Sequence, residues 1–432
     1  MQDLLNILWP TDPALRWTLA VAAATNVACA LVGCYLVLRR MSLLGDAIAH
    51  AVLPGLVIAF LFSGTLAIGA MFVGAFFAAI ATTLLTQTLH RQGGIAEDAS
   101  MGVVFTSLFA LGVVLVKRYS ENIDLDASCV LQGNLNFVAA YTINVAGHEI
   151  PRAFVSILPV VLVNLAAILL LWKELKITSF DAELATSLGF RSNLIHYILM
   201  GLVAATTVGS FEAVGSILVV AMLIVPAATA HLLCDRLVWM LLTATLLAVL
   251  SAYGGFVAAL KFNADPAGMM AVVSGVWYGL AVFFSPRHGV VAALVRNART
   301  TLRIVCEDLL ALLFRLEELR TTRRLAAHEA VQAVGGGVLP RVGLWLLARQ
   351  RLVRKSPELQ LTPAGQHRAT QLVRSHRLWE AWLVQTLGLP LDHVHAPAER
   401  MEHFIDERLQ KELATDLHEI ARDPHGREIP GS

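Results

Sequence analysis

Long apolar stretches fill the chain up to about residue 285 and are missing after it. Each stretch holds roughly 17 to 25 residues with few charges, which is the length a helix needs to cross a bilayer. The stretches lie at 17–38, 46–63, 66–86, 99–116, 153–172, 194–209, 211–233, 237–260 and 268–285. This pattern predicts about nine transmembrane helices. The count becomes eight if the short pair within 194–233 forms one element.

The pattern of apolar positions changes in the last third of the chain. Apolar residues recur every three or four positions over 302–332, and the glycines at 335–337 end that helical pattern. The elements predicted next are a helix over 339–350, a hairpin around Ser356-Pro357, and helices near 363–387 and 396–420. Helices followed by a short hairpin are the order of a winged helix, so this part is predicted to be a winged-helix domain followed by further helices.

Composition supports the same division into two regions. The 432 residues are 56% hydrophobic and only 15% charged, where a soluble domain has about 25% charged residues. Residues 1–286 carry 27 charged side chains, and residues 287–432 carry 38. The net charge of +1 gives no indication of a nucleic-acid or acidic partner, because it averages two unlike regions. We therefore expect an all-α polytopic membrane protein of about 8–9 transmembrane helices, followed by a soluble domain.

Basic residues set the expected orientation, since cytoplasmic loops are enriched in Lys and Arg. With nine spans and the N-terminus outside, eight basic residues fall in inside loops: Arg39, Arg40, Arg91, Lys173, Lys176, Arg191, Arg236 and Arg287. Five fall outside: Arg16, Lys117, Arg118, Arg152 and Lys261. This bias predicts a multi-pass protein of the cytoplasmic membrane whose charged C-terminal domain lies in the cytosol.

Ionisable residues within predicted spans are candidates for function, because a charge in a bilayer is costly. Asp46 and His50 are four residues apart, so they share one helix face and can reach the same cation. Pro54 follows closely and is expected to interrupt the helix next to the pair. The alternative is that Asp46 caps a helix and His50 is a core residue. Glu212 is a second intramembrane acid, which either lines the same path or caps a helix at the outer interface.

The charged loop after the fifth predicted span contains a short amphipathic segment. Asp181 is placed as an N-cap, Leu184 and Leu188 share one face, and Gly189 is a stop signal. A short helix of this kind on the cytosolic side is what a transport protein needs to dock a motor subunit. Any loop can contain one amphipathic turn, so this signal alone is weak.

The soluble part is rich in histidine and glutamate at helical spacing. His376 and Glu380 are four residues apart on one predicted helix, whereas Glu399, Glu402 and His403 share another. His395 comes just before that second set. Nitrogen and oxygen donors without a thiolate favour Mn or Fe(II), and Zn also fits. The alternative interpretation is a solvated helix face.

Four motifs together resemble the permease subunits of ABC transporters for manganese, zinc and iron. They are MSLLGDAIAHAVLPG (41–55), SFEAVGSILVVAMLIVPAATAHLL (210–233), SFDAELATSLGF (179–190) and ADPAG (264–268). The resemblance covers nearly all of residues 1–290, the predicted transmembrane domain. It implies that Asp46 and His50 bind metal in the translocation path, with Glu212 as a further acid. It also implies that the segment from Asp181 through Glu183 to Gly189 couples to an ATP-binding subunit.

A second resemblance covers the end of the chain. LTPAGQHRATQLVRSHRLWEAWLVQTLGLPLDHVHAPAERMEHFIDERL (361–409) and DPHGREIPG (423–431) are similar to the metal-binding and dimerisation domain of the diphtheria toxin repressor and manganese transport regulator family. The implied division is a winged helix over 300–362 and a metal-binding domain over 363–432. The resemblance also implies that Asp308 is a ligand. A glutamate at position 399 is similar to the residue that the manganese-responsive members have there. A second acid of those members would fall at Ala311, so one ligand is missing.

The segment that corresponds to a DNA-recognition helix, 335–353, has Pro340 inside it and Trp345 where polar base readers are needed. We therefore do not expect sequence-specific DNA binding. No GxxxxGK[ST] loop occurs in the chain, so the protein is expected not to be an enzyme and ATP hydrolysis must come from a partner.

Two hypotheses follow from the sequence. The first is a permease half of an ABC importer for divalent metal, Mn²⁺ before Zn²⁺ or Fe²⁺, with a cytosolic metal-sensing domain. Its expected partners are an ATP-binding subunit, a second permease subunit of the same or another chain, an extracytoplasmic metal-binding protein and membrane lipid. The alternative is a membrane-tethered, metal-dependent transcription regulator, which requires DNA binding.

Overall fold

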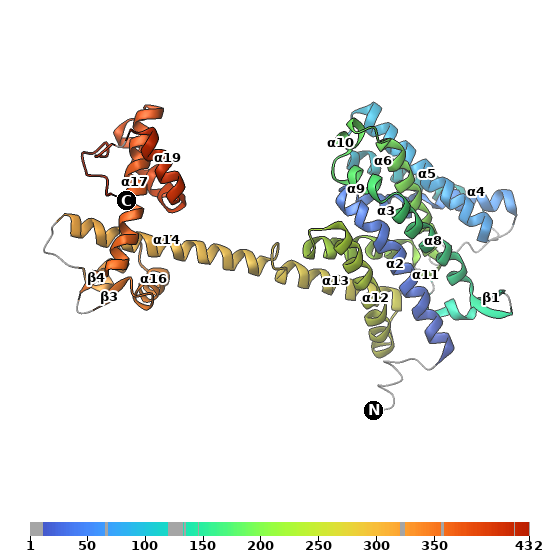
Figure 1. Cartoon of the computed structure of the whole chain (residues 1–432). Helices are drawn as coiled ribbons and strands as arrows, with labels where there is room; N and C mark the ends of the chain where they lie inside the picture. The colour runs from blue at the N-terminus through green and yellow to red at the C-terminus, as the bar shows by residue number, and fades with distance from the viewer. Residues whose placement is uncertain are drawn as a thin grey trace. The chain divides into compact units, whose positions relative to one another are not determined.

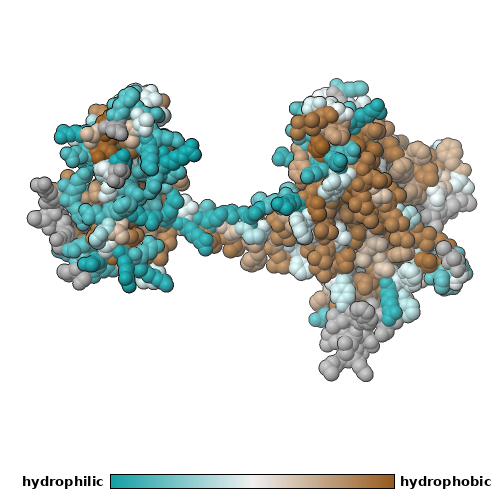
Figure 2. Space-filling view, in the orientation of Figure 1, coloured by the Kyte–Doolittle hydropathy of each residue, from teal (hydrophilic) through white to brown (hydrophobic). Residues whose placement is uncertain are grey.

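The computed structural model describes residues 12–64, 68–119, 133, 135–145, 147–319, 325–355, 358–418 and 420–431. They form two compact units, Met1–Ala292 and Ala293–Ser432. Apolar surface prevails on the first unit and polar surface on the second (Figure 2). The predicted hairpin tip at Ser356-Pro357 lies outside the described residues.

The first unit is almost entirely helical (Figure 1). Its helices are α2 (Pro13–Leu38), α3 (Leu43–Ala51), α4 (Leu53–Ser63), α5 (Ile68–Gly93), α6 (Glu97–Tyr119), α8 (Arg152–Leu170), α9 (Trp172–Phe180), α10 (Ala182–Ser187), α11 (Ser192–Leu233), α12 (Leu237–Phe262) and α13 (Pro266–Phe284). A short helix, η1 (Leu135–Ala140), precedes an antiparallel hairpin of β1 (Thr142–Val145) and β2 (His148–Pro151).

Eight helices in the described ranges are long and apolar enough to cross a membrane, with α3 and α4 counted as one span. The predicted membrane fold class is thus confirmed. The two short spans predicted within 194–233 form one element, α11, but that element is not a straight helix. Gly215 inside it has φ 76° and ψ 163°, a backbone conformation that is essentially restricted to glycine.

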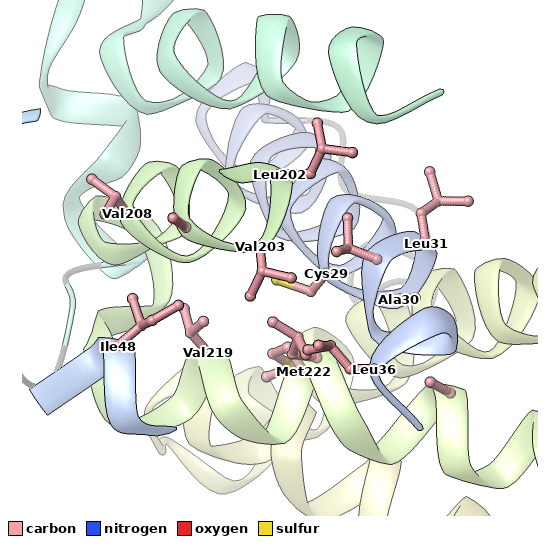
Figure 3. Close-up of a cluster of buried hydrophobic side chains, with 14 of the residues drawn as sticks. Cys29, Ala30, Leu31, Leu36, Ile48, Leu202, Val203, Val208, Val219 and Met222 are labelled. Atoms are coloured by element: carbon pink, nitrogen blue, oxygen red, sulfur yellow. The ribbon is translucent and has the colours of Figure 1, made fainter. Parts of the chain in front are cut away.

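The chain folds back at Gly215. Cys29 and Gly33, one turn apart on α2, contact Ser210 and Leu223 from the two sides of the break. A straight helix would place Ser210 and Leu223 about 20 Å apart, which is too far for neighbours one turn apart. Figure 3 shows the turns with Val203 and Val208 stacked over those with Val219 and Met222. The two arms of α11 therefore run beside each other against α2.

Close backbone contact holds α2 against the second arm of α11. A Cβ atom at Gly33 would lie 1.8 Å from the Leu223 carbonyl oxygen, so only glycine fits. Two buried asparagines also hold helices together: the Asn26 amide donates to the Ala248 carbonyl at 3.0 Å, and the Asn164 amide donates to the Thr206 hydroxyl at 2.7 Å. Packing of small residues and hydrogen bonds thus replace the hydrophobic effect inside this bundle.

The second unit begins within α14 (Val290–Glu318). Its other elements are α15 (Ala327–Ala333), α16 (Val338–Arg349), β3 (Val353–Lys355), β4 (Leu359–Leu361), α17 (Pro363–Leu387), η2 (Leu391–His393), α18 (His395–Met401), η3 (Glu402–Phe404) and α19 (Glu407–Asp416). β3 and β4 form an antiparallel hairpin with Val353 opposite Leu361. Three helices and a hairpin occur in the predicted order.

Two predicted helices are shorter than expected. The predicted helix over 302–332 ends with α14 at Glu318, and a new helix begins after Ala326, whose N–H donates to the Glu329 carboxylate at 3.0 Å. The predicted helix over 396–420 is interrupted at Glu402–Ile405, because Asp406 accepts the Leu409 N–H at 2.8 Å and starts α19. In both cases a local cap restarts the helix.

The second unit has its own cores. Leu309 and Leu313 of α14 pack with Leu344 and Leu347 of α16. A separate cluster joins α17 and α19 through buried residues that include Leu378 and Leu413. Of the residues predicted to bind metal, Asp308 on α14 and His376 and Glu380 on α17 lie on elements that contribute to these clusters.

Gly215→Ala should lower the thermal unfolding midpoint of the purified protein by several degrees, because the reversal at Gly215 costs an L-residue about 1–3 kcal/mol. Gly201→Ala is the matched control: Gly201 lies on the same helix, and an added Cβ there has no neighbour within 4 Å. Thermal scans in detergent measure both. Equal midpoints for the two variants would mean that the reversal does not depend on glycine.

Candidate metal sites

Asp46 and His50 lie on α3 with the His50 Nε2 3.5 Å from the Asp46 Oδ1. Both side chains are partly exposed, at 40% and 33%. The helix is interrupted at Val52, two residues after His50, and Pro54 lies in the first turn of α4. The structure thus places Asp46 and His50 close together, next to the interruption between α3 and α4. Asp46 does not act as a helix cap, because α3 begins at Leu43.

Glu212 is placed apart from this pair. Its Oε1 lies 3.2 Å from the Nε of Arg152 and forms an ion pair with it, and Glu212 lies three residues before the reversal at Gly215. Within the described ranges, no third His, Cys, Asp or Glu joins Asp46 and His50 in a group whose ligand atoms all lie within 4.8 Å of one another. The structure therefore shows a two-residue group with Glu212 paired elsewhere.

The loop predicted to couple to a motor subunit forms the short helix α10. The Asp181 carboxylate accepts the Leu184 N–H at 2.8 Å, which confirms the predicted N-cap. Leu184 and Leu188 are 50% and 60% exposed, and Gly189 has φ +88°. Glu183 lies in the first turn. The helix therefore presents two leucines to its surroundings.

Arg39 connects both flanks of α10, a role that the sequence did not indicate. Its guanidinium donates to the Thr178 hydroxyl at 2.7 Å and to the Ser179 hydroxyl at 3.1 Å, just before α10. A third nitrogen lies 3.4 Å from the Nδ1 of His196, just after α10, and His196 also contacts Gln87. Arg39 had been assigned only to membrane topology.

In the second unit, His376, Glu380 and His395 form one group. The Nε2 of His376 lies 3.1 Å from the Glu380 Oε1, and the Nδ1 of His395 lies 2.8 Å from the same oxygen. His376 and Glu380 are buried, whereas the His395 side chain is 58% exposed. The group is therefore open to solvent on one side only.

Asp308, Glu402 and His403 form the second group. The Nε2 of His403 lies 3.3 Å from the Asp308 Oδ1 and 3.9 Å from the Glu402 Oε1. The other oxygen of Glu402 lies 2.5 Å from the Nδ1 of His376. Glu402, which is 3% exposed, thus connects the two groups.

Two residues near these groups were missed by the sequence analysis. The Glu307 Oε2 lies 2.9 Å from the Nδ1 of His403, on the side away from Asp308. The Nε2 of His425, in the DPHG segment, lies 3.8 Å from the Glu380 Oε1. Glu307 directly precedes the predicted ligand Asp308, and His425 lies within the DPHG motif. The sequence therefore contained a signal for each of these two residues.

Glu399 belongs to neither group and is exposed. The prediction placed it on one continuous helix with Glu402 and His403, but α18 ends at Met401 and the next two residues belong to η3. Because Glu399 lies on a different helix from Glu402 and His403, the three side chains do not share one helix face. Ala311, where the missing acid was expected, is 3% exposed and packs with Leu372 and Val373.

Hydrogen bonds control the protonation of these groups. Burial raises the pKa of Glu380, but hydrogen bonds from His376 and His395 outweigh burial and lower it to about 2. Burial lowers the pKa of His403, but hydrogen bonds to Asp308 and Glu307 outweigh burial and raise it to about 9. At neutral pH, Glu380 is therefore ionised and His403 carries a proton. A metal ion bound to His403 must displace that proton.

The donor atoms of both groups fit a divalent cation. Each group offers carboxylate oxygen and imidazole nitrogen and no thiolate, which suits Mn or Fe(II) and also Zn. Buried carboxylates need a positive partner, and a metal ion supplies one. The groups can therefore hold a metal without rearrangement of the elements that carry them.

Comparison with protein families now identifies the larger part of the chain. Residues 11–285 match the model of the ABC 3 transport family. The chain belongs to this family. Its multi-pass membrane unit is thereby explained, and residues 362–431 match a second model, the iron dependent repressor, metal binding and dimerisation domain.

Known relatives are similar over the membrane unit. The manganese transport system membrane protein MntD of Bacillus subtilis is 46% identical over 65% of this chain and 95% of that protein. The zinc transport system membrane protein TroD of Treponema pallidum is 43% identical over 63% of this chain and 74% of that protein. The solved structure of PsaBC from Streptococcus pneumoniae in complex with Fab matches with a TM-score of 0.57 and 28% identity, over 67% of this chain and 98% of that one.

Glu307→Gln should weaken Mn²⁺ binding by roughly 10- to 100-fold, because the carboxylate that orients His403 through its Nδ1–H is lost while the other donors remain. Titration of the purified protein with Mn²⁺, followed by the free-ion electron paramagnetic resonance signal, measures the affinity. Glu317→Gln, on the same helix, is the control. Unchanged binding in Glu307→Gln would exclude a positioning role for Glu307.

Proposed function

We propose that the protein is the permease subunit of an ABC importer that moves a divalent metal ion, Mn²⁺ before Zn²⁺ or Fe²⁺, across the cytoplasmic membrane. The observation that carries this proposal is the Asp46–His50 pair at an interrupted helix, in a chain of the ABC 3 transport family. Relatives named for manganese and zinc transport support the cargo, and another is named for chelated iron.

The pair can pass a cation because it offers only part of a coordination shell. One carboxylate and one imidazole leave most ligand positions to water or to a second subunit. Neighbouring Phe105 and Phe109 rings, with centroids 5.8 and 5.9 Å from the His50 ring, limit water around it. A site with few protein ligands releases its ion more readily than a closed cage.

The reversal in α11 supports a cytosolic C-terminal domain. If each arm of α11 crosses the membrane, the chain crosses nine times, and Arg287 lies on the same side as Arg39 and α10. Two contacts agree with this: the Ser285 hydroxyl donates to the Leu232 carbonyl at 2.6 Å, and Arg287 pairs with Asp235. The ATP-binding subunit then docks on α10 from that side.

The remaining partners follow from the same proposal. A second permease subunit, identical or homologous, completes the translocation path, and an extracytoplasmic metal-binding protein delivers the ion. Arg39, through its contacts on both flanks of α10, transmits movement of the docked motor to α2 and to the start of α3. The chain itself supplies no catalytic residue to ATP hydrolysis in this scheme.

We assign a sensing role to the second unit. Cytosolic metal occupies His376, Glu380, His395, Glu402, His403 and Asp308, displaces the His403 proton, and lowers transport activity by favouring an inactive state. Glu399 remains a candidate ligand only if α18 rearranges. The exposed face of α16 is mainly apolar, with Val338, Val342 and Trp345, and the helix contains no Asn, Gln, Ser or Thr. Its exposed polar residues are two arginines, Arg341 and Arg349, and Arg349 stacks on Trp345, which weighs against the transcription-regulator alternative.

Asp46→Ala and His50→Ala should each reduce ATP-driven Mn²⁺ uptake at least about tenfold while membrane insertion stays normal, because each removes one of two path ligands. Uptake into proteoliposomes with the assembled transporter measures this. His231→Ala, which removes an exposed imidazole at the end of α11, is the control. Wild-type uptake in either path variant would contradict the ligand assignment.

Loss of the sensor should make uptake insensitive to internal metal. Mn²⁺ loaded inside proteoliposomes is expected to inhibit the full-length transporter, and both His376→Ala and a chain truncated before residue 300 should lose that inhibition. The point variant guards against effects of truncation on assembly. Identical inhibition curves for all three proteins would refute the sensing role.

A further inference from the structure

The first turns of α14 expose a continuous apolar face. Val290, Val291, Leu294 and Val295 are 45%, 42%, 63% and 44% exposed, and Ala298 extends the row. At 100° per residue these positions cover one side of the helix. Exposure falls from Leu302 onward, where α14 enters the core of the second unit through Leu309.

The charges around this face have one sign. Between Ser285 and Cys306 the sequence contains four arginines, Arg287, Arg296, Arg299 and Arg303, and no Asp or Glu. Arg287 pairs with Asp235, and Arg303 donates to the His403 carbonyl at 2.6 Å. Among the described residues, Arg296 and Arg299 have no acidic partner within 4.0 Å, so they are available to an external anion.

The place of this segment in the chain, directly after the last membrane span, indicates what it contacts. α14 begins six residues after Phe284, the last residue of the final membrane-spanning helix α13. A helix that starts there begins at the bilayer surface. An apolar face with an arginine, Arg299, at its edge fits the boundary between acyl chains and anionic headgroups, and is typical of a helix lying in the interface.

We propose that residues 290–299 of α14 lie on the membrane surface, with the valine and leucine side chains in the acyl boundary and Arg299, about 40° beyond Val295 around the helix, at anionic lipid phosphates. Acidic residues are absent beside the arginines. An anionic lipid surface accounts for that absence, whereas a second copy of the chain or another protein partner does not. This lipid contact is independent of metal binding and of the cargo. It fixes the first part of the helix that carries Glu307 and Asp308.

A photo-crosslinking residue, p-benzoylphenylalanine, placed at Ala298 or Thr300 tests the proposal in the full-length chain. The two positions are about 160° apart around the helix, so they form a matched pair at nearly the same point along it. In nanodiscs of phosphatidylcholine with about 30 mol% phosphatidylglycerol, position 298 should give at least fivefold more lipid adduct than position 300 by mass spectrometry. Arg299→Gln should reduce that adduct toward the yield in pure phosphatidylcholine, whereas Arg296→Gln, on the opposite side of the helix, should leave it unchanged.

Hydrogen exchange of the unsubstituted chain gives a second measurement. Amides of residues 290–299 should exchange several-fold more slowly in anionic nanodiscs than in neutral ones, while those of α17 should not change. Equal adduct at positions 298 and 300, no lipid adduct at 298, or adducts to protein alone would overturn the proposal. Exchange that does not depend on lipid charge would exclude the role of Arg299.

Discussion

Charged and polar groups withdrawn from water must find partners, and this constraint organises both units of the protein. In the membrane unit, Arg152 pairs with Glu212, and the Asn26 and Asn164 amides donate to neighbours within the helix bundle. In the second unit, the buried carboxylates of Glu380 and Glu402 are held by imidazoles. An unpaired charge in either environment costs several kcal/mol, so these contacts restrict which arrangements of helices are stable.

The two acids of the membrane unit differ in how far their charge is compensated. Glu212 is paired with Arg152 at 3.2 Å, next to the reversal at Gly215. Asp46 has only a histidine at 3.5 Å and is partly exposed, so its charge is incompletely compensated. Under the proposed function, a passing cation would complete that compensation, whereas a fully satisfied ligand set would retain the ion.

Local signals in the sequence predicted much of this architecture. Hydropathy located the spans, and Asp181 was recognised as a cap because its partner is three residues away. The sequence could not predict contacts between residues far apart in the chain. Arg39, for example, contacts Thr178 and His196 only in the folded protein. Glu399 was misplaced because its spacing from Glu402 assumed an unbroken helix, whereas Asp406 caps a new one. Spacing predicts neighbours only where a helix is known to continue.

Glu402 contacts both candidate metal groups, so metal binding at one group would depend on metal binding at the other. Its two oxygens face His376 and His403, at 2.5 and 3.9 Å, so a cation bound to one oxygen alters the charge felt at the other. A metal held by His403 would withdraw electron density from Glu402 and weaken its hydrogen bond to His376, which would change the affinity of the first group. By linkage, a metal at the first group would alter binding at the second by the same factor. Asp308 belongs to α14, the helix that follows the last membrane span, so that helix would contribute a ligand to the second group.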